Sequence, residues 1–192
     1  MNFLNVIAMA SMVIAMASAA NAQTMDGEAM DHQNTDHAAH RKMMAEAQRQ
    51  AQVSQLGKDV MPFTLAATTH IFAKSETGGT QQVVAKAAGD EAQIKLIRQH
   101  LHEIQAQFLK GDFSGPAHIH GQAMPGLVEL KAANPGQIAI DYKDIKDGAE
   151  LTYQTSDAKL VAALHKWFDA QLSDHGKDAM EGHAHHEGMK MP

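Results

Sequence analysis

Residues 90–108 have the sequence DEAQIKLIRQHLHEIQAQF, and this stretch indicates the fold class most clearly. Asp90 and Glu91 suit the N-terminal end of a helix, because carboxylates are favoured at its positive pole. Apolar side chains then recur every three or four residues, namely Ile94, Ile97, Leu101, Ile104 and Phe108. That spacing predicts an amphipathic helix that packs one face against a core and ends before Gly111.

Two strands are predicted before this helix. Residues 63–72 (FTLAATTHIF) are rich in β-branched and aromatic side chains, and a second short strand is expected over residues 81–86. The Gly78-Gly79 pair between them predicts a hairpin turn.

The second half of the core repeats this order of elements. Residues 137–142 and 150–154 predict another hairpin around Asp147-Gly148. Ser156 or Asp157 is the expected cap of a last amphipathic helix. The sequence therefore predicts an α+β fold of two layers: a mostly antiparallel four-stranded sheet in ββα-ββα order, with helices on one face.

The chain divides into four regions. Residues 1–22 contain an apolar, uncharged run and end in Ala20-Asn21-Ala22, which predicts a cleaved signal peptide and a periplasmic or secreted protein that meets the membrane only through that signal. Residues 23–60 form a polar tract rich in His and Met, expected to be flexible or partly helical. Residues 61–175 form the globular core, and residues 176–192 form a second His/Met-rich tail.

The composition excludes several classes of site. The chain has 192 residues and no cysteine, so disulfides, iron–sulfur clusters, zinc–thiolate sites and thiol nucleophiles are excluded. A formal net charge of -6 argues against a nucleic-acid partner, which requires a basic surface. Motifs of serine hydrolases, P-loops and dinucleotide sites are missing from the sequence. A metal ion would have to bind imidazole, thioether or carboxylate groups.

Histidine and methionine, with thirteen residues each, supply the candidate ligands. In the core the candidates are His70, His100, His118, His120, His165, His175 and Met124. In the tails they are His32, His37, His40, Met43, Met44, His183, His185, His186, Met189 and Met191. Imidazole suits Cu(II), Zn(II) and Ni(II), whereas thioether sulfur prefers Cu(I). A single His/Met-rich tail is as often an inert, solvated segment as a metal-binding one. Two tails of the same composition in one chain favour metal capture.

The stretch 111–126, GDFSGPAHIHGQAMPG, is predicted to be an ordered loop, followed by a short helix over 127–132. In an extended segment, residues two apart point the same way, so His118 and His120 could share a site. Met124 could return to that site through a turn at Gly121. A purely structural loop is the alternative.

Helical spacing sorts the other core histidines. His100 and His165 lie at the edges of their apolar stripes, whereas His102 lies opposite its stripe and is expected to be exposed. His175 precedes the expected C-cap Gly176, where a histidine often only offsets the helix dipole.

Four blocks of the core resemble a family of small exported bacterial proteins without an established function, some of them labelled aspartate carbamoyltransferase. The blocks are ATTH (67–70), GDFS (111–114), IHG with MPGL (119–121 and 124–127) and WFDAQLSDHG (167–176), within residues 61–178. The resemblance implies that His70, His120, Met124 and His175 lie in motif positions. A carbamoyltransferase is not expected, because such an enzyme needs two large domains and an arginine-rich site, and this core contains one arginine, Arg98.

The favoured function is a periplasmic copper-binding protein for resistance, buffering or delivery, with Cu(I) or Cu(II) as cargo and zinc or nickel as further candidates. Its core site would contain His70, His120 and Met124, completed by His100, His165 or His175. Its partner would be a metal exporter or a cuproprotein. The alternative is a metal-dependent hydrolase or oxidase with an open histidine site and Asp112 or Asp174 as base. In a third interpretation, the core is an interaction module whose histidines are structural.

Overall fold

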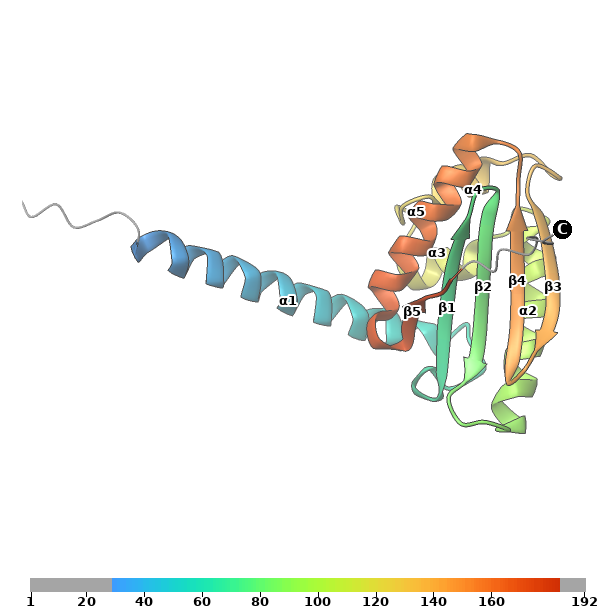
Figure 1. Ribbon diagram of the computed structural model, residues 1–192, viewed down its shortest axis with the longest axis horizontal. Helices are drawn as coiled ribbons and strands as arrows, with labels where there is room; N and C mark the ends of the chain where they lie inside the picture. Colours follow the sequence, from blue (N-terminus) through green and yellow to red (C-terminus); the bar gives the residue numbers. More distant parts are fainter. Residues whose placement is uncertain (1–28, 184–192) are drawn as a thin grey trace, which may run out of the picture. The chain divides into compact units, whose positions relative to one another are not determined.

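The computed structural model describes residues 29–183, with side chains from residue 37 onward (Figure 1). The expected signal peptide and four tail candidates, His185, His186, Met189 and Met191, lie outside the described residues, as does the side chain of His32. The chain divides into two compact units at Ala38-Ala39, and α1 crosses this boundary. The remaining description concerns the second unit.

The described helices and strands of the core follow the predicted order, with α3 and β5 as additions that the sequence does not predict. They are α1 (Ala29–Gly57), β1 (Thr68–Ser75), β2 (Gly78–Ala85), α2 (Glu91–Phe108), α3 (Ser114–His120), α4 (Leu127–Ala132), β3 (Ala139–Ile145), β4 (Gly148–Gln154), α5 (Ala158–His175) and β5 (Ala179–Glu181). The strands form one sheet in the order β3-β4-β2-β1-β5, antiparallel except for the parallel pair of β1 and β5. The predicted α+β class with a mostly antiparallel sheet is confirmed.

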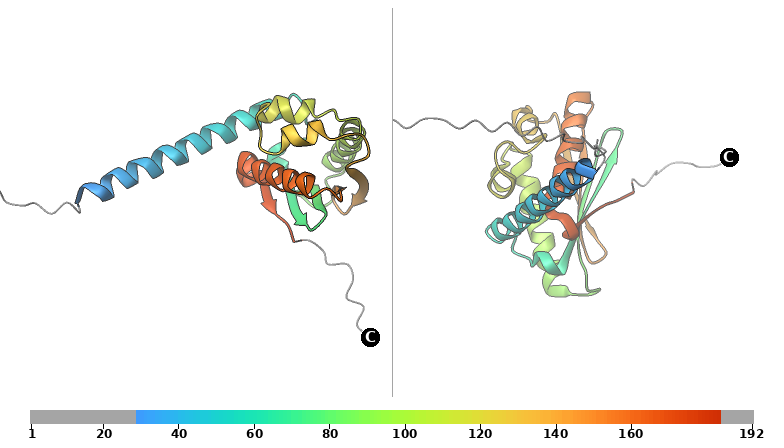
Figure 2. Two further views of the ribbon diagram at one scale, coloured as in Figure 1. Left: turned by 90° about the horizontal axis from the view of Figure 1, so that it is seen from above. Right: turned by 90° about the vertical axis from the view of Figure 1, so that its left-hand side faces the viewer.

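The helices α2 and α5 pack on one face of the sheet (Figure 2). Strand side chains alternate between this face and the other, as the pleat requires. Phe72, Val83, Leu151 and Tyr153 point toward the helices and are buried. The apolar stripe of α2 and the ring of Trp167 on α5 meet them, and together they form the core.

Helices α2 and α5 begin at the acidic residues that the sequence indicates as their caps. Asp90 caps α2 by accepting a hydrogen bond from the backbone nitrogen of Gln93, and Asp157 caps α5 in the same way from that of Lys159. The cap of α5 is therefore Asp157 and not Ser156. Gly176 ends α5 with a positive φ of 53°, a conformation that glycine adopts without strain.

The sheet contains a fifth strand, which the sequence analysis placed in the tail. After Gly176 the chain turns back, and residues 179–181 pair with His70, Ile71 and Phe72 of β1. The stretch Ala-Met-Glu is too short to carry a strand pattern, so only the reversal at Gly176 brings it to this edge.

The predicted loop over 111–126 is the main error in the predicted elements, because residues 114–120 form helix α3. Pro116 lies in the first turn, where a helix does not need its missing N–H group. Phe113 precedes the helix and stacks on Phe108 of α2, with ring centroids 4.4 Å apart. The first strand is also shifted relative to its prediction, since residues 65–67 form a 3-10 turn before β1.

Candidate functional site

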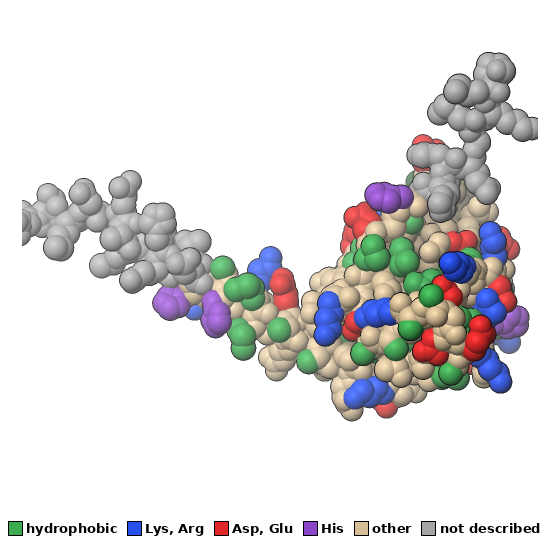
Figure 3. All heavy atoms as spheres, turned by 60° about the horizontal axis from the view of Figure 1, so that its bottom comes forward, with side chains coloured by type: hydrophobic (Ala, Val, Ile, Leu, Met, Phe, Trp, Pro, Cys, Tyr) green, Lys and Arg blue, Asp and Glu red, His purple; other side chains and the backbone are tan. Residues whose placement is uncertain are grey.

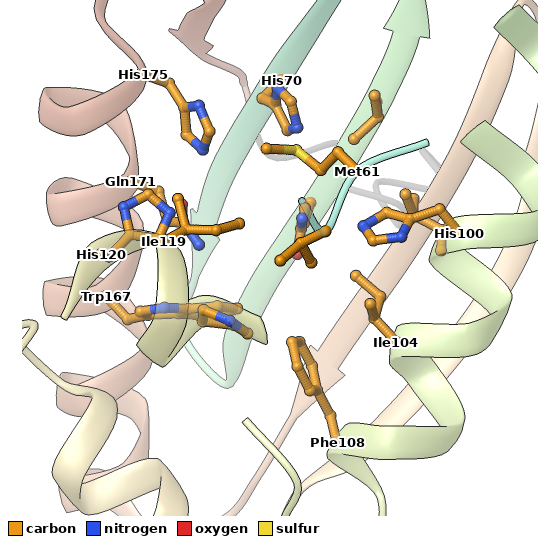
Figure 4. A pocket seen from close by; sticks show the side chains of 15 residues that line it. Met61, His70, His100, Ile104, Phe108, Ile119, His120, Trp167, Gln171 and His175 are labelled. Carbon is orange, nitrogen blue, oxygen red and sulfur yellow. The ribbon is translucent and has the colours of Figure 1, made fainter. Parts of the chain in front are cut away.

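A cavity of about 40 Å³ lies between the helical face of the sheet and α2, α3 and α5. Four buried histidines line it, one from each of β1, α2, α3 and α5: His70, His100, His120 and His175. Figure 4 shows them around the cavity together with Met61, which follows α1. Segments far apart in the sequence therefore gather imidazole and thioether groups in one place.

Three of these imidazole rings are in direct contact. The rings of His70 and His175 stack almost parallel, with centroids 4.6 Å apart and an interplanar angle of 11°. The ring of His120 meets that of His175 edge to face at 5.2 Å. His100 lies across the cavity, with its ring edge-on to Phe63 at 5.5 Å.

Asp174 connects this cluster to α1. Its carboxylate accepts hydrogen bonds from Nε and from a terminal nitrogen of Arg49, at 3.0 and 2.5 Å, and from Nδ1 of His120, at 2.8 Å. Arg49 also donates to the backbone carbonyl of His120 at 2.8 Å. Burial raises the pKa of Asp174, but the hydrogen bonds from His120 and Arg49 and their positive charge outweigh this effect and lower it to about 2.

Burial keeps the imidazoles uncharged. It lowers the pKa of His70 to about 4, assisted by the nearby His100, and it lowers the pKa of His100 to about 4 as well. The pKa of His175 lies well below its ordinary value for the same reason. At neutral pH these three rings are therefore neutral, and each offers a lone pair.

A hydrogen bond fixes the donor atom of the His120 ring. Because Asp174 is ionised, it can only accept, so Nδ1 of His120 carries the hydrogen of this bond. Nδ1 of His70 is buried and has no hydrogen-bond partner among the described residues.

Three buried side-chain atoms in the described part of the chain have no hydrogen-bond partner, and all three belong to residues that line this cavity. They are Nδ1 of His70, Nε1 of Trp167 and Oε1 of Gln171. A buried polar atom without a partner generally costs about 1–3 kcal/mol. Their concentration in one cavity indicates a binding site.

The rings do not converge on a common point. Within residues 29–183, no group of three or more His, Asp or Glu side chains has positions that could hold a metal ion. Imidazole lone pairs lie in the ring plane, so the parallel stack of His70 and His175 directs them alongside one another. Metal binding at this cluster requires at least one ring to rotate.

Two predicted ligands of the core site lie elsewhere. Residues two apart in a helix point about 200° apart, so the predicted common side of His118 and His120 is wrong. His118 is exposed and pairs with Asp59 at 3.1 Å. Met124 is buried but lines a neighbouring surface pocket beside Arg49, and the thioether that lines the histidine cavity belongs to Met61.

His165, in the middle of α5, has a structural role. Its Nε2 lies 3.0 Å from the carbonyl oxygen of Ser75 and 2.9 Å from that of Gly78, so it holds the turn between β1 and β2. His102 is exposed, as expected, and its ring meets that of Tyr142 edge to face at 5.4 Å.

The described tail candidates lie at the surface. His37, His40, Met43 and Met44 are exposed side chains of α1, and His183 is exposed after β5. Figure 3 shows histidine and hydrophobic side chains at the surface of this helix. Met43 and Met44 are each 60% exposed.

Sequence reasoning did not identify Met61, Arg49, Trp167 or Gln171 as members of the site. The spacing of Trp167, Gln171 and His175 at i, i+4 and i+8 is a signal that was available, because such residues share one helix face. Arg49 lies in a polar tract and carries no comparable signal.

The described helices include none that combines the length and apolar character of a membrane span. Comparison of the chain with protein-family models, with curated proteins and with solved structures finds no match.

Proposed function

We propose that the protein is a periplasmic copper-binding protein that buffers or delivers the ion, with its core ligands at the histidine cavity. The observation that carries this proposal is the contact of His70, His175 and His120 in a cavity lined by Met61. Relative to the ligand set expected from the sequence, Met61 takes the place of Met124.

The chemistry of these donors suits Cu(I). A metal ion binds the neutral form of imidazole and not the protonated imidazolium. Because the pKa values of His70 and His175 are lowered, these rings need not release a proton to bind a metal ion at neutral pH. Thioether sulfur is a soft ligand that favours Cu(I) over zinc or nickel. A chain without cysteine has no softer donor to offer.

Neighbouring groups support the ligands. In many metal sites a histidine donates its second ring N–H to a carboxylate or a backbone carbonyl, which orients the ring. Asp174 has this relation to Nδ1 of His120, at 2.8 Å. Rotation of His175 out of its stack on His70 would let the nitrogen atoms approach one ion.

The exposed residues of α1 would act as a surface collecting site. His40, Met43 and Met44 are solvent-accessible and can exchange an ion quickly with a metal exporter or a cuproprotein.

The enzyme alternative has less support from the geometry. Asp174 is held as an anion by Arg49 and His120, and its low pKa makes it a poor base. Asp112 is exposed and accepts from the backbone nitrogen of Ser114 at the start of α3. Neither candidate base is therefore suited to activate water in the cavity.

Anaerobic competition for Cu(I) between the full chain and a chromophoric chelator tests the proposal. The variant His70→Gln/His175→Gln should lose one tight binding equivalent, because both core imidazoles are removed. The matched control His102→Gln/His118→Gln removes two exposed core imidazoles and should keep it. Equal stoichiometry and affinity in the two variants would show that the cavity is not the copper site.

A further inference from the structure

We propose that Trp167 and Gln171 of α5 form a polar subsite in the histidine cavity that binds a water molecule. The subsite belongs to the metal-free protein, so it stands independently of copper binding. It rests on three observations: the orientation of the two side chains, their burial and their unpartnered atoms.

Residues four apart on a helix lie one above the other on the same face. Trp167 and Gln171 have this spacing, and both line the cavity (Figure 4). Trp167 is 1% exposed and Gln171 is 5% exposed, so bulk water does not solvate them. Nε1 of Trp167 and Oε1 of Gln171 have no hydrogen-bond partner among the described residues.

The two atoms define the chemistry of the ligand. The indole N–H can only donate, and the amide oxygen can only accept. A bound molecule must therefore accept one hydrogen bond and donate another, which water does. An anion would meet the unfavourable dipole of the Gln171 oxygen, and an apolar molecule would leave both atoms unpartnered.

The cavity has the size for such a ligand. One water molecule needs about 10–15 Å³ of cavity volume, so a cavity of about 40 Å³ accommodates roughly three. Gln81, which also lines the cavity, does not compete for the same position, because its Oε1 already accepts from the hydroxyl of Tyr153 at 2.8 Å. Nδ1 of His70 is a further acceptor for a second water.

The chain contains one tryptophan, so its indole N–H gives a single, unambiguous nuclear magnetic resonance signal. In the ¹⁵N-labelled, metal-free full chain, magnetisation transfer from water should reach the Trp167 indole proton through space. The nuclear Overhauser effect between water and the indole proton should have the sign that is characteristic of a long-lived bound water. The indole proton itself should exchange only slowly with solvent.

The variant Gln171→Leu removes the acceptor and should reduce this transfer to background, whereas Gln99→Leu, at an exposed position of α2, should leave it unchanged. A wild-type protein whose slowly exchanging indole proton receives no transfer from water would overturn the proposal. An unchanged transfer in folded Gln171→Leu would overturn it as well. The wild-type result is decisive even if the variant does not fold, and it is independent of any copper measurement.

Discussion

The metal-free protein is expected to be on the order of 4 kcal/mol less stable at about pH 5 than at about pH 7.5, through two buried histidines. His70 and His100 have a pKa of about 4 in the folded state, below the ordinary value of 6.5 that applies to the unfolded chain. The unfolded state therefore binds protons first as the pH falls. Stability is complete above about pH 6.5 and is lost between this value and about pH 4.

Each ring contributes ~2 kcal/mol at about pH 5, because protonation in the folded state is suppressed there while the unfolded chain is almost fully protonated. His175 acts in the same direction. Negatively charged neighbours oppose this lowering of the pKa only weakly. They are Asp178 beside His70 and Glu103 beside His100. Asp174 has a pKa of about 2, so it becomes protonated only below this window.

Urea denaturation of the metal-free protein at the two pH values measures this difference. The variant His100→Gln should reduce the pH dependence by ~2 kcal/mol, and His102→Gln, at an exposed position of the same helix, should keep all of it. A free energy of unfolding that stays constant between the two pH values would contradict the burial of neutral imidazoles.

Replacement of Asp174 by asparagine is expected to lower the free energy of unfolding by ~2 kcal/mol. The carboxylate accepts hydrogen bonds from both Arg49 and His120, and an uncharged amide can no longer compensate the guanidinium charge. The loss stays below that of a fully buried pair, because the side chain of Arg49 is 36% exposed and water replaces part of the interaction.

Asp169→Asn is the matched control on the same helix. Asp169 pairs with Lys74, but its side chain is 60% exposed, so this substitution should change stability by less than ~0.5 kcal/mol. Denaturation of the two variants at neutral pH gives the comparison. If Asp174→Asn costs no more than Asp169→Asn, the link between α1 and the histidine cluster contributes nothing to stability.

The sequence predicts the long helices well because their signals are local. The apolar stripe of α2 and the acidic caps Asp90 and Asp157 lie within a few residues of the backbone that they organise. Helix α3 is missed because Gly115 and Pro116 indicate a loop, whereas packing of Phe113 and Ile119 into the core stabilises a helix. Strand β5 depends on pairing with β1, a contact that no local pattern encodes.

The candidate site is predicted to a lesser extent. His70, His120 and His175 are singled out from the sequence, and the structure places their rings in contact. The choice of Met124 over Met61 rested on proximity along the chain. Which thioether enters the cavity depends instead on how the segment after α1 crosses the helical layer, and this is a long-range property.

X-ray absorption spectroscopy of the protein loaded with one equivalent of Cu(I) tests the copper site most directly. Imidazole nitrogen and one thioether sulfur should surround the ion. The sulfur signal should be lost in Met61→Leu and retained in Met124→Leu. A spectrum without imidazole scattering would contradict the account, as would a sulfur signal that survives Met61→Leu unchanged.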